Sequence, residues 1–218
     1  MRAFLQPLQG LVRDHWRPCG IPSLLAILVI AALFVDPHGT YSEVAGCEVW
    51  GLPYKDAREY AGPYRVIAHP PCARWCRLAG LVEARWGLKR GDDGGCFASA
   101  MASVRRWGGV LEHPAYTDAW AAFGLTAPLS IGWHPAGFGD PGWVCQVEQH
   151  HYGHKARKAT WLYAVGTALP TLRWGRARRP KYMVSWCDTA DPRPRLTKKE
   201  ASATPVAFRD ELIRLVRT

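Results

Sequence analysis

Val66-Ile67-Ala68-His69-Pro70-Pro71-Cys72-Ala73-Arg74-Trp75-Cys76 joins an apolar run to two prolines and two cysteines. Its apolar run, Val66 to Ala68, predicts a buried strand. The two prolines end that strand because they have no amide proton to donate to a sheet. The next residue, Cys72, is then presented at the carboxyl edge of the sheet, where open α/β sheets bind their ligands.

Two interpretations of Cys72 follow from this position. It could be a small buried cysteine after a turn, which is the usual role of a cysteine there. The rigid proline pair and the neighbouring His69 and Arg74 favour a reactive thiol instead, because nearby positive charge stabilises a thiolate. We therefore expect Cys72 to be a nucleophile, with His69 and Arg74 close to its substrate.

The composition indicates one domain and a phosphate-rich partner. The chain has 218 residues, of which 48% are hydrophobic and 21% charged, as in ordinary globular proteins. The net charge of +10 favours nucleic acid or a nucleotide as partner. The 7 cysteines do not have the spacing of a disulfide framework, which favours a cytoplasmic protein. Cys72 and Cys76 have no second close pair beside them, so no metal site is expected.

The first strand is expected within an apolar run from Leu24 to Val35. The run is too short to span a bilayer comfortably, and no small-x-small cleavage site follows it. We interpret Val29 to Val35 as a central parallel strand buried on both faces. Residues 1–23 then form an N-terminal extension to a single domain at 24–218. A secretory signal or a membrane anchor remains an alternative, but no membrane association is favoured.

An acidic, glycine-containing turn, Asp36-Pro37-His38-Gly39, follows that strand. A nucleotide or an adenosyl cofactor binds at this position in open α/β sheets. The turn therefore supplies three candidate cofactor ligands, Asp36, His38 and Gly39.

Hydrophobic periodicity predicts the remaining elements. Apolar residues three and four apart predict helices over 96–107 and 205–216. Strands are expected at 110–111, 143–148 and 161–165. The strand at 110–111 runs into Glu112-His113-Pro114, so it also ends in polar residues and a proline. Together these elements predict an α/β fold with a mostly parallel sheet flanked by helices.

Two basic segments lie in the second half of the chain. The loop 149–160 contains three histidines with Lys155, Arg157 and Lys158, and it suits phosphate better than metal because it holds no carboxylate. Residues 167–195 form a basic, irregular insert in which cations alternate with aromatic residues. That pattern is typical of backbone contacts with base stacking, although a solvated loop would have the same composition.

The order of these motifs resembles that of the DNA cytosine-5 methyltransferases, and best matches small methyltransferase-like proteins of phages and prophages. The segment ending at Cys72 resembles the family's Pro-Cys nucleophile loop, and Glu112 occupies the place of its Glu-Asn-Val motif. The basic loop stands where the family has Gln-x-Arg-x-Arg. Residues 195–201 are similar to the family's Arg-x-Leu-Thr-x-Arg-Glu segment, and 203–208 to the final motif that closes the cofactor pocket.

This resemblance implies a reduced Rossmann-like methyltransferase fold, DNA as substrate and S-adenosylmethionine as cofactor. Cys72 would attack carbon 6 of a pyrimidine and Glu112 would stabilise the activated ring. The implied catalytic residues are Cys72, Glu112 and Arg157. The implied substrate contacts are His69, Arg74, His113, Lys155 and Lys158. The implied cofactor contacts are Asp36, His38, Gly39, Pro70 and Thr204.

The sequence also departs from the family pattern. The family's Phe-x-Gly-x-Gly cofactor loop is replaced by Asp36-Pro37-His38-Gly39, and the target-recognition region shrinks to 167–195. Two alternatives therefore remain open. One is a pyrimidine-nucleotide-modifying enzyme that uses the same cysteine adduct with another electrophile or on a free nucleotide. The other is a non-catalytic nucleic-acid-binding relative.

Overall fold

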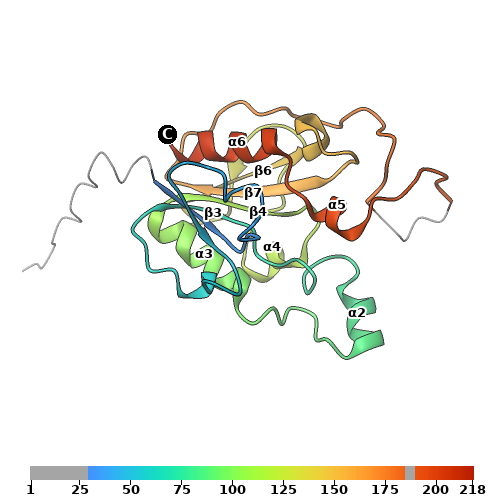
Figure 1. The fold of residues 1–218 in the computed structure, drawn as a ribbon, viewed down its shortest axis with the longest axis horizontal. Helices are drawn as coiled ribbons and strands as arrows, with labels where there is room; N and C mark the ends of the chain where they lie inside the picture. The colour runs from blue at the N-terminus through green and yellow to red at the C-terminus, as the bar shows by residue number, and fades with distance from the viewer. Residues whose placement is uncertain (1–28, 185–189) are drawn as a thin grey trace, which may run out of the picture.

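The structure, a computed structural model, describes residues 29–184 and 190–218. The predicted extension at 1–23 and the start of the apolar run lie outside the described residues. Seven strands form one sheet in the order β2-β1-β3-β4-β7-β6-β5, with helices on both faces (Figure 1). The protein is therefore an α/β protein, as predicted.

One half of the sheet is parallel. β1 (Ile30–Leu33) lies between β2 (Cys47–Trp50) and β3 (Arg65–Ala68). β3 pairs in turn with β4 (Gly109–Pro114). All three pairings in this half are parallel, so the carboxyl ends of the four strands lie at the same edge.

The other half is antiparallel. β7 (Ala159–Val165) lies between β4 and β6 (Trp143–Glu148), and β5 (His134–Pro135) forms the far edge. A mostly parallel sheet is therefore not confirmed, because three of the six strand pairings are antiparallel. The physical reason is the short link between β6 and β7, which contains only the 3-10 helix η2 (Gln149–Tyr152) and no crossover helix.

The two main helices cover opposite faces of the sheet, as Figure 1 shows. Alternate strand residues point to opposite sides. Leu33, Val66 and Leu111 pack with α3 (Cys96–Trp107). Ile30, Ile67 and Val110 pack with α6 (Val206–Val216). Both helices were predicted, because three- and four-residue apolar spacing is a strong signal.

The first strand is confirmed in the centre of the parallel half, with all four residues of β1 completely buried. It is shorter than the predicted 29–35 because Phe34 adopts a φ of 59°, which takes the chain out of the sheet. Within 29–184 and 190–218, no helix combines the length and apolar character needed to cross a membrane.

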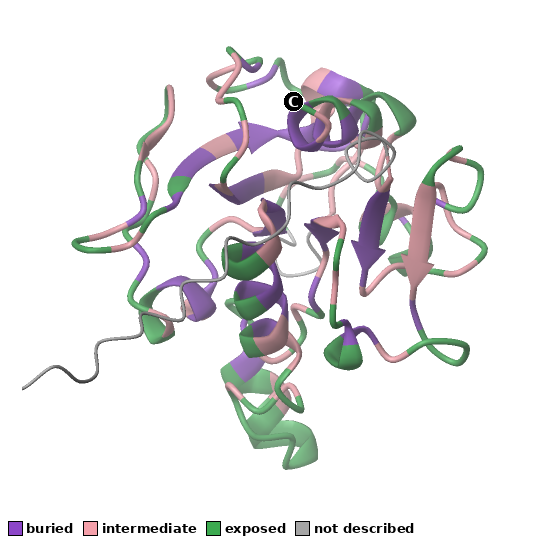
Figure 2. Ribbon diagram, turned by 90° about the vertical axis from the view of Figure 1, so that its left-hand side faces the viewer, coloured by how far each residue is buried: buried purple, intermediate pink, exposed green. Residues whose placement is uncertain are grey.

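Four short elements complete the fold: η1 (Ala57–Glu59), α2 (Ala79–Trp86), α4 (Asp118–Ala122) and α5 (Lys198–Ser202). α2 stands away from the body of the protein (Figure 1), and exposed residues dominate it (Figure 2). β2 and β5 were not predicted.

Gly109 sets the close approach of β3 and β4, and substituting it tests the fold. Its φ is +130°, and a Cβ there would lie 1.9 Å from the carbonyl oxygen of Val66. We expect Gly109→Ala to lower the free energy of unfolding by about 3 kcal/mol. Gly124→Ala is the control, because Gly124 has a φ of +71° but open space around it. It should cost about 1 kcal/mol. Urea unfolding curves give both values, and equal losses would contradict this role for Gly109.

Candidate functional site

A cavity lies at the carboxyl edge of the parallel strands. The chain places β2 on one side of β1 and β3 on the other, so the strand order reverses between β1 and β3. Open sheets bind ligands in the crevice outside such a reversal. Here the segments that follow β1, β3 and β4 line a cavity of about 1520 Å³.

Most of the predicted site residues meet on the wall of this cavity. Cys72 and Glu112 both line it, from the ends of the neighbouring strands β3 and β4. The predicted residues on the wall are Asp36, His38, Gly39, His69, Pro70, Cys72, Glu112, Arg157, Lys158 and Thr204. The first and last of these residues, Asp36 and Thr204, lie more than 160 positions apart in the sequence, and the fold brings them to one cavity.

Three predicted residues, Arg74, His113 and Lys155, are not part of that wall. His113 is completely buried among aromatic rings, and burial lowers its pKa to about 4. It points away from the cavity because successive strand residues face opposite sides, and its neighbour Glu112 faces the cavity. The ammonium of Lys155 lies on the surface, 2.8 Å from the carboxylate of Glu200.

The buried carboxylate of Glu112 is the centre of a hydrogen-bond chain. Its Oε2 lies 2.9 Å from Nδ1 of His69, and its Oε1 accepts a 2.9 Å hydrogen bond from Nε2 of Gln149. On the far side of the imidazole, Nε2 of His69 lies 2.9 Å from the hydroxyl of Tyr41. Gln149 also donates to the hydroxyl of Thr160 at 3.0 Å. Residues from five separate segments are therefore connected through one charge.

Electrostatics keep Glu112 ionised. Burial alone would raise the pKa of this carboxyl, but the hydrogen bond from His69 and the charge of Lys158 outweigh it and lower the pKa to about 2. Burial and the charge of Glu112 raise the pKa of Tyr41 well above its usual value. At neutral pH Glu112 is therefore a hydrogen-bond acceptor, and the hydroxyl of Tyr41 keeps its proton.

Cys72 lies on a helical turn that the core holds in place. Its carbonyl accepts hydrogen bonds from the amides of Trp75 at 3.0 Å and Cys76 at 2.9 Å. The buried indole of Trp75 donates to Asp93 at 2.8 Å and packs against Phe97. Cys72 itself is partly exposed to the cavity, so its thiol is both accessible and fixed.

The resting state of that thiol differs from the sequence-based expectation. Burial, then Cys76 and Glu112, raise the pKa of Cys72, and only Lys158 acts strongly in the other direction. The prediction that His69 and Arg74 favour a thiolate is therefore wrong. The reason is that burial disfavours the charged thiolate and that Cys76 and the carboxylate of Glu112 disfavour it further, while Arg74 lies off the cavity wall. Cys72 is a protonated thiol at neutral pH.

A basic wall faces these groups. The guanidinium of Arg157 donates to the carbonyl of Ala177 at 3.1 Å, and the ammonium of Lys158 donates to the carbonyl of Ser202 at 3.2 Å. These contacts fasten the basic insert and α5 to the cavity. Sequence reasoning singled out the basic composition but not the individual wall cations Arg176, Lys198 and Lys199. It also missed Tyr41 and Gln149, which no motif marks.

The three histidines of the basic loop hold the backbone. The His150 ring contacts the carbonyl of His154 at 2.5 Å, and the His154 ring contacts the carbonyl of Ala156 at 2.7 Å. The His151 ring contacts the carbonyl of Gly175 at 3.2 Å. In the described part of the chain, no three His, Cys, Asp or Glu side chains gather as metal ligands.

Two strained residues border the cavity. Phe34 and Tyr116 have φ angles of 59° and 64°, and both line the cavity. Bulky side chains rarely adopt this conformation, which costs on the order of 1–3 kcal/mol and is concentrated at functional sites. The strain is an independent sign that this edge of the sheet is functional.

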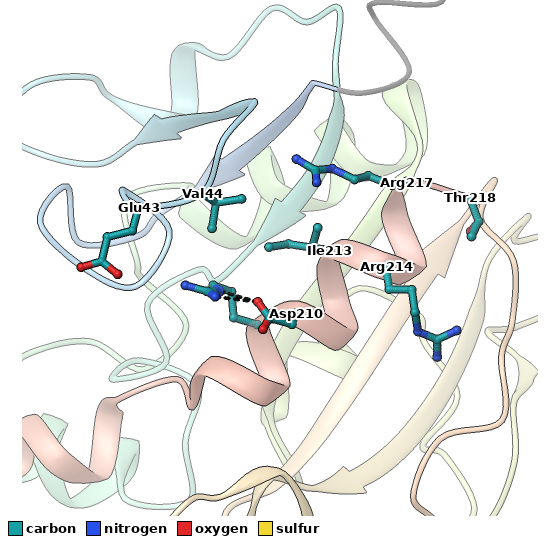
Figure 3. A pocket seen from close by; sticks show the side chains of 8 residues that line it. Glu43, Val44, Asp210, Ile213, Arg214, Arg217 and Thr218 are labelled. Carbon is teal, nitrogen blue, oxygen red and sulfur yellow. Dashed lines mark hydrogen bonds and ion pairs between the residues drawn. The ribbon is translucent and has the colours of Figure 1, made fainter.

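A second hollow, of about 540 Å³, lies between α6 and the connection from β1 to β2 (Figure 3). Its arginines have structural partners. Arg209 donates to the carbonyl of Thr40 at 2.6 Å, and Arg217 to that of Ala45 at 2.7 Å. These bonds attach the β1–β2 connection to the last helix, so we assign this hollow a structural role.

Comparison with known proteins gives no relative for this chain: no family model, no curated protein and no solved structure matches it. The evidence for a function is therefore the geometry and the chemistry of the cavity.

The low pKa of Glu112 predicts a pH-dependent contribution to stability. The carboxyl binds its proton more weakly in the folded state than in the unfolded state, so its stabilisation is full above pH 4.5 and is lost as the pH falls toward 2. We expect Glu112→Gln to destabilise the fold by about 3 kcal/mol at pH 7 and by much less at pH 3. Chemical unfolding at both pH values measures this, with the exposed Glu43→Gln as control. A penalty that stayed constant with pH would refute the assignment.

Proposed function

We propose that this protein modifies a pyrimidine of nucleic acid at carbon 5, with Cys72 as its nucleophile. The observation that carries the proposal is that Cys72 and Glu112 line one cavity from the ends of adjacent parallel strands. This is the juxtaposition that the resemblance to cytosine-5 methyltransferases requires. A thiol and a carboxylate at the same edge of the sheet suit a pyrimidine ring, because the thiol can attack carbon 6 while the carboxylate holds the exocyclic amine.

The first step is addition of the thiol to the ring. The S–H bond of Cys72 breaks, a bond forms between Sγ and carbon 6, and N3 of the ring gains a proton. Carbon 5 then becomes an enamine-like nucleophile. The ionised Glu112 accepts a hydrogen bond from the exocyclic amine of cytosine, which becomes more positive in this step. Lys158, the cation that lowers the pKa of Cys72, assists loss of the thiol proton.

The second step reverses the addition. When carbon 5 carries its new substituent, it loses its hydrogen as a proton, and the electron pair of that bond restores the double bond. The bond between Sγ and carbon 6 then breaks, N3 of the ring releases the proton that it gained in the first step, and Cys72 regains a proton from solvent. S-adenosylmethionine, when bound, supplies an electrophilic methyl group for carbon 5.

The cavity supports a cofactor beside the base. Its volume of about 1520 Å³ exceeds that of a single-ligand site, which is roughly 300–1,000 Å³. At the end of β1 it offers the carboxylate of Asp36 and the hydroxyl of Thr40, and Thr204 adds a second hydroxyl. These groups fit the ribose hydroxyls and the amino-acid end of an adenosyl cofactor. No residue from 42 to 68 lines the cavity, so we assign the contact with the ribose hydroxyls to the carboxylate of Asp36.

The sheet supports the same assignment. The order β2-β1-β3-β4 is the 2-1-3-4 order of doubly wound α/β sheets, which bind nucleotides at the β1/β3 switch point. A reduced Rossmann-like methyltransferase fold with an antiparallel second half is therefore the fold that we propose. A free pyrimidine nucleotide remains the second candidate substrate, because the cavity wall carries enough cations to bind its phosphate.

Covalent trapping tests the proposed function. The protein is incubated with S-adenosylmethionine and a single-stranded oligonucleotide that contains 5-fluorocytosine, then separated on a denaturing gel. Fluorine at carbon 5 cannot leave as a proton, so the adduct persists. We expect a shifted band for the wild-type protein and for Cys76→Ala, whose thiol lines the same cavity, but none for Cys72→Ala.

The same experiment with 5-fluoro-deoxycytidine monophosphate distinguishes the two candidate substrates. An adduct with the mononucleotide alone would replace the nucleic-acid assignment by the nucleotide one. A band that survives Cys72→Ala, or no adduct with either substrate, would refute Cys72 as the nucleophile.

A further inference from the structure

An exposed apolar helix stands at the mouth of the cavity. Leu78 lines the cavity, and α2 starts at the next residue and leads away from the protein body (Figure 1). Within α2 only Ala79 is buried, while Leu81 is 59% and Trp86 57% exposed. Exposed apolar side chains gathered on one element indicate an interaction surface rather than a solvated one.

The charge on this helix identifies the kind of partner. Arg77 precedes α2, Arg85 lies in its last turn and Lys89 follows it, against a single acidic residue, Glu83. The guanidinium of Arg85 lies 5.0 Å from the centre of the Trp86 ring and supports it from one side. Flat rings combined with cations bind nucleic acid bases by stacking and their phosphates by charge.

The wall of the cavity therefore carries two different kinds of residue. Leu78 and Tyr116, which is 58% exposed, form an apolar side that α2 extends outward. Arg176, Lys198 and Lys199 form a cationic side on the same cavity. In Figure 1, α2 and α5 lie on the same side of the protein. A strand that passes between them would place its bases on one side and its phosphates on the other.

We infer that the substrate is unpaired, single-stranded DNA, in which one base next to the target stacks on Trp86 and another packs against the apolar side chain of Leu81. This inference rests on the proposed function and specifies its substrate. In a duplex the flat faces of the bases are covered by their neighbours, so exposed apolar side chains find no partner there. In a single strand those faces are open. An unpaired target base also reaches Cys72 without the cost of extraction from a duplex.

Binding measurements test this inference. Fluorescence anisotropy is recorded with a labelled single-stranded oligonucleotide and with its duplex, at one fixed salt concentration. We expect the wild-type protein to bind the single strand at least about tenfold more tightly than the duplex. The double substitution Leu81→Ser with Trp86→Ala should weaken single-strand binding about tenfold or more, because it removes the surfaces against which two bases pack.

Phe138→Ala is the matched control, because Phe138 is fully exposed but does not line the cavity. It should bind as the wild type does. Both substitutions alter exposed side chains, and unfolding midpoints equal to that of the wild type verify that the variants are folded. Equal affinity for duplex and single strand, or no effect of the double substitution, would overturn the inference.

Covalent trapping separates this inference from the proposed function. Trapping that is equally efficient on duplex and single strand, and insensitive to the α2 substitutions, would overturn the single-strand surface and leave Cys72 as nucleophile. Selective single-strand binding through α2 without any adduct would support the surface and refute the catalytic role.

Discussion

The carboxylate of Glu112, buried between the imidazole of His69 and the amide of Gln149, connects the elements on which the site depends. A buried charge is costly unless hydrogen bonds and opposite charge satisfy it. Both oxygens of Glu112 have such partners, at 2.9 Å each, and Lys158 adds a favourable charge. The partners come from the end of β3, from η2 and from the loop after β1 through Tyr41. Gln149 in turn contacts Thr160 of β7. Satisfying this one charge therefore fixes how the ends of β3, β4 and β7 meet η2 and the loop after β1.

The same interaction explains why Cys72 is not activated at rest. His69 lies three positions before Cys72 but holds the carboxylate, so the thiol experiences the negative charge of Glu112 more than any positive charge. A protonated thiol is protected from unwanted chemistry in an empty cavity. The exocyclic amine of a cytosine would pair with Glu112 and remove part of the repulsion. In this account the nucleophile becomes reactive only when a substrate is present.

The elements that local pattern determines were predictable from the sequence. β3, α3 and α6 follow from an apolar run ended by two prolines and from helical periodicity. The position of Cys72 and Glu112 at adjacent strand ends followed from the same logic, since parallel strands end at one edge. The antiparallel pairing of β6 with β7 could have been predicted from the loop at 149–160, which has no room for a crossover helix. The pairing of β7 with β4 could not, because it joins segments that are far apart in the sequence. Tyr41 and Gln149 were not predictable either, since their role depends on partners 28 and 37 positions away.

The central claim is that Cys72 adds reversibly to carbon 6 of a pyrimidine, and hydrogen exchange at carbon 5 measures this most directly. Addition makes carbon 5 basic enough to take up a proton from water, and elimination then releases either hydrogen. The measurement uses a single-stranded oligonucleotide with tritium at carbon 5 of cytosine and no cofactor. We expect tritium release that Cys72→Ala abolishes and Cys76→Ala preserves. No release above that of the Cys72→Ala variant, from an oligonucleotide that the protein binds, would contradict it.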